Sequence, residues 1–157
     1  MFRKSLIVLA LIALALGTTR TVRAHCEVPC GIYADQHRFE SMLEDVATIQ
    51  KAMGQILELN KSKDDALAAN QLSRWVATKE THATHVQHVI AQYFMAQRLK
   101  PADPADVDAW KAYVDKLTKA HVVMRAAMKC KQSVDVADAD TARNAILAFH
   151  KAYAGKN

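Results

Sequence analysis

The feature that most constrains the fold is a long stretch without glycine or proline, which extends from Gln55 to Lys100. These two residue types interrupt helices most strongly, so their absence permits a helix of up to about 35 residues after Asp64 or Asp65. The middle of this stretch, residues 79–85, is polar, which predicts that the helix overhangs its neighbours there or that a polar group docks against it. Its apolar residues are predicted to face a core: Leu67, Leu72, Trp75, Val76, Val86, Val89, Ile90, Tyr93 and Phe94.

Two more amphipathic segments flank this stretch. Apolar residues recur every three or four positions over residues 36–60, which predicts a helix with Asp35 as its N-terminal cap. Residues 101–104 contain two prolines and predict a break, after which a third helix covers about residues 105–131. The predicted core face of this third helix consists of Val107, Trp110, Val114, Leu117, His121, Met124 and Met128.

A fourth helix is predicted to begin at Asp138 or Asp140 and to stop at Gly155. Four amphipathic helices with short connections are typical of an up-and-down bundle. We therefore expect an all-α, four-helix bundle over residues 36–155, preceded by an arm without helical periodicity.

The first 24 residues have the three parts of an export signal. Arg3 and Lys4 form a basic start, residues 5–16 are apolar, and small or compact residues end the segment at Ala24. The apolar run is too short to span a membrane as a mature helix, although an uncleaved anchor is the alternative. We expect cleavage before His25 and export of the protein to the periplasm or the exterior.

The charge of the chain belongs mostly to this leader. Four of the 21 basic residues and none of the 16 acidic residues lie in it, so the mature chain is close to neutral. No basic stripe with interleaved aromatic residues is visible, which argues against nucleic-acid binding. No second apolar run is long enough to span a bilayer, so we expect no membrane association after cleavage.

The residues 25–33 read His-Cys-Glu-Val-Pro-Cys-Gly-Ile-Tyr and bring together many metal-binding groups. Removal of the leader gives His25 a free α-amine beside its imidazole. Cys26 and Cys30 offer two thiolates, and the amide before Cys26 lies where its deprotonation closes two chelate rings. A planar set of two nitrogens and two sulfurs suits Ni(II) or Cu(II) and not tetrahedral Zn(II). Pro29 permits a tight reversal of the chain between the two thiols.

The same spacing allows a second interpretation, a small disulfide between Cys26 and Cys30 in a structural arm. The terminal histidine favours metal binding over the disulfide. The mature chain holds three cysteines, and an odd number cannot close into a complete disulfide framework. The third, Cys130, is predicted to be a buried free thiol late in the third helix.

The motif His-Cys-x-x-Pro-Cys-Gly-x-Tyr at a processed N-terminus resembles the nickel hook of nickel-containing superoxide dismutases. It is complete here from His25 to Tyr33. The resemblance implies a four-helix bundle with the hook at one end, one nickel ion per subunit and assembly into a homohexamer. It also implies that two superoxide ions and two protons give dioxygen and hydrogen peroxide while nickel cycles between Ni(II) and Ni(III).

The resemblance also implies roles for individual residues of the hook. His25 supplies its α-amine and, in the oxidised form, its imidazole. Cys26 supplies its amide nitrogen and thiolate, and Cys30 supplies its thiolate. The bond before Pro29 is expected to be cis, and Tyr33 is expected near the open axial face.

The resemblance further implies supporting residues around the hook histidine. A glutamate of the first helix bonds its ring in the family, and Glu40 matches that position, with Glu44 as the alternative. A basic residue of the second helix also approaches the ring, for which His82 and Arg74 are the candidates. Glu27 is expected to orient the backbone of the hook.

Two further histidines, His85 and His88, follow His82 at intervals of three residues and are predicted to lie at the surface or an interface. Two rival functions stay open at this point. The first is a non-catalytic exported bundle that carries nickel or copper, and the second is a disulfide-armed structural bundle. Tyr33 and Glu40 favour catalysis, because a carrier needs neither a placed phenol nor a supported histidine.

Overall fold

The amphipathic segments form four long helices in a computed structural model that describes residues 35–62 and 65–155. Helix α2 covers Asp35–Leu59 and is followed by a short 3-10 turn, η1, at Asn60–Ser62. Helix α3 covers Ala66–His88 and continues directly into η2, a π-helix at Val89–Arg98. The remaining helices are α4 at Val107–Gln132 and α5 at Val136–Tyr153. The described residues contain no strand, and the predicted all-α four-helix bundle is confirmed.

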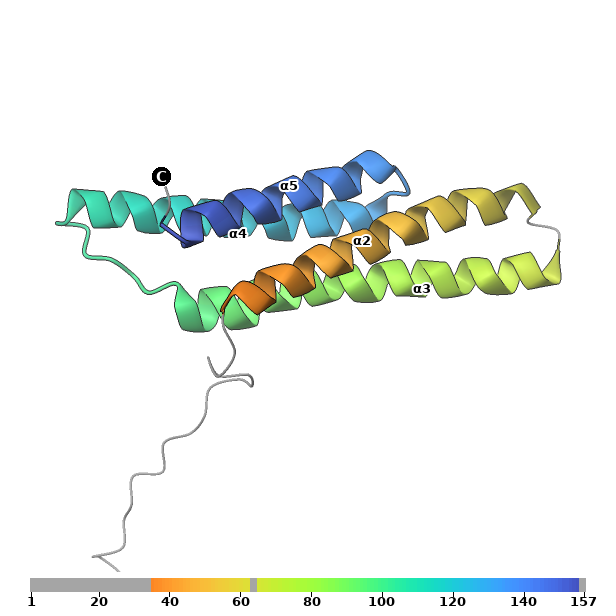
Figure 1. Cartoon of the computed structure of the whole chain (residues 1–157), viewed down its shortest axis with the longest axis horizontal. Helices are drawn as coiled ribbons and strands as arrows, with labels where there is room; N and C mark the ends of the chain where they lie inside the picture. The colour runs from red at the N-terminus through yellow and green to blue at the C-terminus, as the bar shows by residue number, and fades with distance from the viewer. Residues whose placement is uncertain (1–34, 63–64, 156–157) are drawn as a thin grey trace, which may run out of the picture.

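The helices form two antiparallel hairpins that are offset along the long axis (Figure 1). Figure 1 shows that the tip between α2 and α3 extends beyond the turn between α4 and α5. At the other end, the first turns of α4 extend beyond the end of η2. Helix α2 therefore begins at the end of the bundle where η2 and α5 finish, and the arm that precedes residue 35 attaches there.

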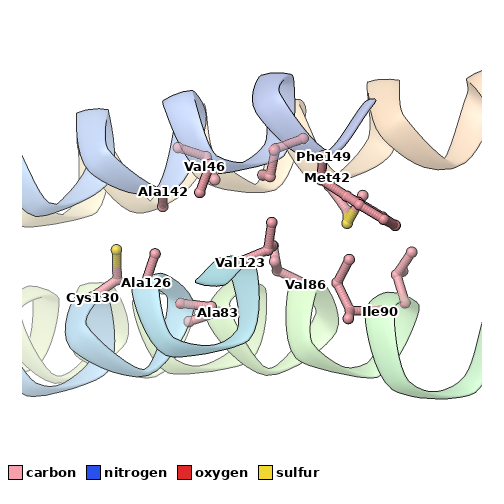
Figure 2. Packing of buried hydrophobic residues seen from close by; sticks show 14 of the residues in the cluster. Met42, Val46, Ala83, Val86, Ile90, Val123, Ala126, Cys130, Ala142 and Phe149 are labelled. Carbon is pink, nitrogen blue, oxygen red and sulfur yellow. The ribbon is translucent and has the colours of Figure 1, made fainter. Parts of the chain in front are cut away.

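The core lies where all four helices overlap (Figure 2). Met42, Phe94, Val123 and Phe149 are among its fully buried side chains and come from four different elements. Each large apolar side chain contributes roughly 1.5–3 kcal/mol of burial energy. Near the start of α2, the ring of Phe39 lies 4.7 Å from that of Phe94 between ring centroids, so aromatic side chains close this end of the core.

The predicted core faces of two helices were partly wrong. Leu67 of α3 is 65% exposed and Val107 of α4 is 73% exposed, because the hairpin offset places these segments beyond the helices of the other hairpin. Further along α4, the face toward the bundle is formed by small residues, and His121 lies at the surface. The apolar side chains left outside on these two helices also include Val76, Trp110, Val114 and Val122.

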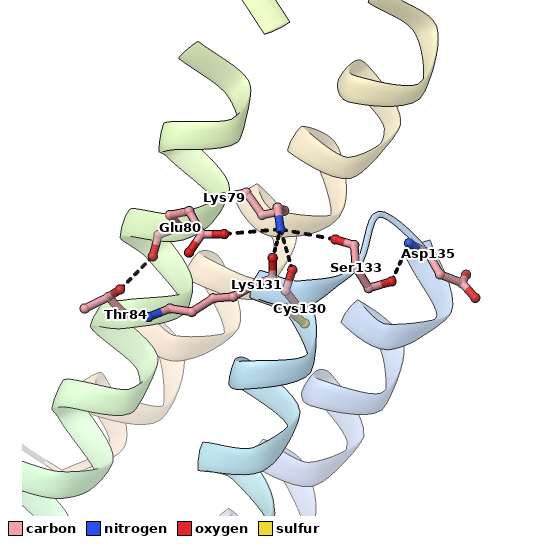
Figure 3. Close-up of polar contacts among 7 residues, drawn as sticks. All are labelled: Lys79, Glu80, Thr84, Cys130, Lys131, Ser133 and Asp135. Carbon is pink, nitrogen blue, oxygen red and sulfur yellow. Dashed lines mark hydrogen bonds and ion pairs between the residues drawn. The ribbon is translucent and has the colours of Figure 1, made fainter. Parts of the chain in front are cut away.

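The polar middle of α3 contains a buried lysine that joins two helices (Figure 3). Lys79 is 4% exposed, and its Nζ donates hydrogen bonds to the carbonyl oxygens of Cys130 at 2.8 Å, Lys131 at 2.5 Å and Ser133 at 3.1 Å. The last carbonyls of a helix have no partners within it, so this ammonium group caps the end of α4. The carbonyl oxygens at the end of α4 thus dock against the polar segment of residues 79–85. This was one of the two alternatives predicted from the sequence.

Across the described ranges, no helix is long and apolar enough to cross a membrane.

Candidate metal centre

The predicted metal ligands lie outside the described residues. These are His25, Cys26 and Cys30, and the predicted neighbours in the hook are Glu27, Pro29 and Tyr33. The first described residue, Asp35, follows Tyr33 by two positions. The structure therefore describes the place where the hook is attached, together with the helix residues that were predicted to support it.

Asp35 joins three elements at this attachment point. Its carboxylate accepts hydrogen bonds from Nη2 of Arg98 at 2.8 Å, from Oη of Tyr153 at 2.6 Å and from the hydroxyl of Tyr93. Asp35 was predicted as a helix cap, but its two oxygens are used for these contacts with η2 and α5. The first described residue, Asp35, is thus fixed to the far ends of two other helices.

The electrostatics of this cluster keep each group in one protonation state. Burial raises the pKa of the Asp35 carboxyl, but hydrogen bonds from Arg98, Tyr153 and Tyr93 outweigh it and leave the pKa below its usual value. Burial and the hydrogen bond to Asp35 raise the pKa of Tyr153 to about 12. The hydrogen bond to Asp35 also raises the pKa of Arg98. The cluster therefore consists of a carboxylate, a guanidinium and neutral phenols at neutral pH.

Two arginines lie against the ring of Tyr93. The guanidinium carbon of Arg38 is 5.5 Å from the ring centroid, and that of Arg98 is 5.7 Å away, both within cation–π range. The Nε of Arg38 is buried and has no hydrogen-bond partner among the residues that the structure describes. This end of the bundle thus holds a buried donor without an acceptor, close to where the hook joins α2.

The predicted glutamate partners lie on the exposed side of α2. Nε2 of Gln36 donates to Oε1 of Glu40 at 3.0 Å, and Nδ1 of His37 lies 3.8 Å from the other oxygen of the same carboxylate. Glu44 is exposed as well, one turn further along α2. The predicted metal ligands lie outside the described residues, so the roles of Glu40 and Glu44 toward the hook histidine stay predictions.

His82 and His85 both bind a buried acid that the sequence interpretation missed. Nδ1 of His82 lies 2.6 Å from Oδ1 of Asp45, and Nδ1 of His85 lies 2.6 Å from Oδ2. Asp45 is only 6% exposed. A signal was available, because Asp45 stands in the apolar stripe of α2 between Met42 and Val46, where a charged residue needs a partner.

These histidines do not form a second metal centre. In residues 35–62 and 65–155, no three His, Cys, Asp or Glu side chains are arranged to hold a metal ion. His88 is exposed on α3, three positions after His85. The prediction of surface histidines therefore holds for His88, whereas His82 and His85 are half-buried against Asp45.

The other basic candidate, Arg74, lies far from the start of α2. Its neighbour Trp75 is contacted by Lys51, whose Nζ is 5.8 Å from the ring centroid. Lys51 follows Asp35 by sixteen residues, which is about 24 Å along a helix. Arg74 is exposed and lies at that level, so the structure does not bring it together with Glu40 or with the attachment point of the hook.

Cys130 is a buried free thiol, as predicted. Its Sγ donates a hydrogen bond to the carbonyl oxygen of Asp138 at 3.4 Å. Burial, with a smaller contribution from the charge of Asp138, raises the pKa of this thiol to about 11. A neutral, enclosed thiol of this kind is unreactive, which agrees with the prediction of a structural free thiol.

Comparison with known proteins identifies the family. The model of the family described as nickel-containing superoxide dismutase matches residues 20–157, and the chain belongs to this family. No curated protein and no solved structure matches it. The chain is thus a nickel superoxide dismutase, an oxidoreductase that takes superoxide as its substrate and one nickel ion per subunit as its cofactor.

Proposed function

We propose that this nickel superoxide dismutase holds its metal in residues 25–33 and uses the bundle to fix the base of that hook. The single observation that carries the proposal is the complete nine-residue motif at a predicted processing point, within the region that matches the family. His25 offers the α-amine and imidazole, Cys26 the amide nitrogen and a thiolate, and Cys30 a second thiolate. Two nitrogens and two sulfurs in a plane fit Ni(II).

The attachment end of the bundle also fits this proposal. Arg38 carries a buried Nε that lacks an acceptor among the described residues, and it lies in the first turn of α2. Backbone carbonyls or the Glu27 carboxylate in the hook are acceptors within the same chain. The metal-bound hook carries negative charge from its thiolates and amidate, so a positive guanidinium beside it is favourable.

The overall reaction combines two superoxide ions and two protons to give dioxygen and hydrogen peroxide. Bound nickel supplies the one-electron couple between Ni(II) and Ni(III). The Tyr33 hydroxyl would orient superoxide or water beside the residues that would hold the nickel ion. Asp35, two positions after Tyr33, is held against η2 and α5 by its hydrogen bonds to Tyr93, Arg98 and Tyr153. Glu40 and His82 are the side chains that we assign to support the imidazole of His25.

Export and assembly are part of the proposal. A leader of residues 1–24 directs the chain to the periplasm or the exterior, and its removal before His25 frees the α-amine. A homohexamer is supported by apolar side chains outside the bundle, such as Trp110 and Val114 on α4 and Leu67 on α3. Burial of such side chains against other copies would stabilise an oligomer.

The decisive experiment measures the mature N-terminus, the nickel content and superoxide dismutation in one preparation. We expect a chain that begins at His25, one nickel per subunit and catalytic turnover. A variant with one extra residue before His25 should lose the electron paramagnetic resonance signal of oxidised nickel, because its amine is no longer free. Tyr33→Phe is the matched control and should keep its nickel while turnover or product inhibition changes.

Three results would contradict the proposal. These are a mature chain that starts elsewhere, full activity in Cys30→Ser, and two cysteines that are joined in a disulfide in the metal-free protein. Stoichiometric nickel without turnover would indicate a carrier instead.

A further inference from the structure

Two phenols share one carboxylate where η2 and α5 end against the start of α2. Oη of Tyr93 donates to Oδ1 of Asp35, and Oη of Tyr153 donates to Oδ2 at 2.6 Å. Arg98 also donates to Oδ2, so Tyr93 is the one hydrogen-bond partner of Oδ1 among the described residues. Hydrogen bonds from a hydroxyl to an ionised oxygen are among the strong ones, and they give each phenolic proton a direct acceptor.

The π-helix brings Tyr93 to this carboxylate together with Arg98. The two residues are five positions apart, and in an α-helix with 3.6 residues per turn they would be turned about 140° from one another. The i→i+5 register of η2 places them on the same side. This register persists to the end of η2, where the backbone N–H of Leu99 donates to the carbonyl oxygen of Phe94 at 2.8 Å. Such helices are rare and occur frequently at functional sites.

The surroundings of Tyr93 favour loss of an electron only together with the phenolic proton. Tyr93 is 5% exposed, and the guanidinium carbons of Arg38 and Arg98 lie 5.5 and 5.7 Å from its ring centroid. Two positive charges at these distances oppose the formation of a third on the ring. Transfer of the proton to Asp35 leaves a neutral radical instead. Burial and the hydrogen bond to Asp35 raise the pKa of Tyr93, so the phenol keeps its proton until it is oxidised.

We propose that Tyr93 is a redox-active tyrosine that repairs thiyl radicals of the hook cysteines, with Asp35 as its proton acceptor. A thiyl radical forms when a thiolate loses one electron to an oxidant derived from the product hydrogen peroxide, such as the hydroxyl radical. Tyr93 returns one electron to the sulfur, which becomes a thiolate again. The phenolic O–H bond breaks and an O–H bond forms on Oδ1 of Asp35, which leaves a neutral tyrosyl radical and a protonated carboxyl group.

The substrate of the enzyme completes the cycle. Superoxide gives one electron to the tyrosyl radical and leaves as dioxygen, while the proton returns from Asp35 to the phenol. The proposal rests on the function proposed above, because it takes Cys26 and Cys30 to be the thiolates at risk. Unrepaired cysteine oxidation proceeds to sulfinic and sulfonic acids. Asp35 follows Cys30 by five positions, so their Cα atoms are at most about 18 Å apart.

The first test does not depend on activity. It is pulse radiolysis of the reduced, nickel-free full protein with the azide radical as one-electron oxidant. We expect the optical band and the electron paramagnetic resonance spectrum of a long-lived tyrosyl radical, which forms more slowly in D2O because a proton moves. Tyr93→Phe keeps the ring between the two arginines and should lose this radical. Asp35→Asn keeps an oxygen acceptor but removes the base, so it should form much less of it.

Tyr113→Phe is the matched control. Tyr113 lies on α4, where its ring is 5.6 Å from that of Trp110 between centroids, and it makes no hydrogen bond to Asp35. This variant should keep the radical. Circular dichroism of each variant checks that the bundle is folded.

The second test adds hydrogen peroxide to the nickel-loaded protein and follows the cysteines by mass spectrometry. Sulfinic acid should appear at Cys26 and Cys30 sooner in Tyr93→Phe than in the wild type or in Tyr113→Phe. The wild type and the control should not differ.

Four results would overturn the proposal. These are a radical that persists in Tyr93→Phe, an unchanged radical yield in Asp35→Asn, a radical that disappears only in Tyr153→Phe, and equal rates of cysteine oxidation in Tyr93→Phe and Tyr113→Phe. A wild-type protein without nickel or turnover would refute the proposed function, whereas the radical in the nickel-free protein would still decide whether Tyr93 is redox-active.

Discussion

Replacement of the buried lysine that joins α3 to the end of α4 gives the sharpest test of how the bundle is held together. Lys79→Met keeps the length of the side chain and removes its ammonium group. Nζ of Lys79 donates to three carbonyls at the end of α4 and lies 3.4 Å from Oε1 of Glu80. The change thus leaves the last turn of α4 without its cap while it preserves most of the apolar contact.

The expected loss can be estimated from the surroundings of each carbonyl. The bond to Cys130 is buried, and an unsatisfied buried carbonyl costs about 1–3 kcal/mol. The bonds to Lys131 and Ser133 are half-buried, so water replaces the ammonium in part and each loss is about 0.5–1 kcal/mol. The variant no longer pays the desolvation cost of a buried ammonium group, which offsets part of this loss of stability. We therefore expect a net loss of about 2–3 kcal/mol, or a Tm lower by roughly 10 °C.

The measurement is urea unfolding of the full protein, followed by far-ultraviolet circular dichroism. Lys131→Met is the control, because Lys131 contributes only its backbone carbonyl to this contact and its own side chain makes none of the three bonds. A Lys79→Met variant within about 0.5 kcal/mol of the wild type, or equal to the control, would refute the reasoning.

Two further predictions concern groups with shifted pKa values. Because the pKa of Cys130 is raised to about 11 and the thiol is buried, it should stay unmodified by iodoacetamide in the native protein up to about pH 9, as mass spectrometry can check. Alkylation of Cys130 as fast as in the unfolded chain would contradict this. In the folded protein, hydrogen bonds from Arg98, Tyr153 and Tyr93 hold the pKa of Asp35 below that of an unfolded aspartate, so its stabilising effect is present above about pH 4 and is lost as the pH falls through the folded pKa. Asp35→Asn should therefore be less stable at pH 7 but close to the wild type near pH 2, and an equal loss at both pH values would refute the linkage.

Local sequence signals were sufficient to predict that four helices form, although α5 begins at Val136 with Asp135 as its cap and not at Asp138 or Asp140. The absence of glycine and proline from Gln55 to Lys100 predicted the long second helix. Asp65 caps this helix by accepting a hydrogen bond from the backbone N–H of Leu67 at 3.1 Å. The metal motif is local as well, because its donors lie within nine residues. Such features depend on neighbours in the chain, and a single sequence contains them.

Features that depend on contacts between helices were missed or placed on the wrong face. The partners of Asp35 are 58 to 118 positions away in the sequence. The local sequence pattern could therefore predict only a role as the N-terminal cap of its own helix. The inward face of α4 uses small residues such as Ala120 and Ala127, whereas its largest apolar residue, Trp110, is 39% exposed. A search for large apolar residues therefore predicted the face of α4 only in part: Leu117 and Met124 pack against the core, whereas Val107, Trp110 and Val114 are exposed. The hairpin offset, which decides what is covered, is a property of the assembled bundle.

The offset also links the fold to the proposed chemistry. Helix α2 begins level with the ends of η2 and α5, and this register brings Tyr93, Arg98 and Tyr153 to one carboxylate. A shift of one helical turn, about 5.4 Å, would break all three hydrogen bonds at once. The bundle thus determines where the segment that precedes Asp35 is attached, and we propose that this segment supplies the metal ligands.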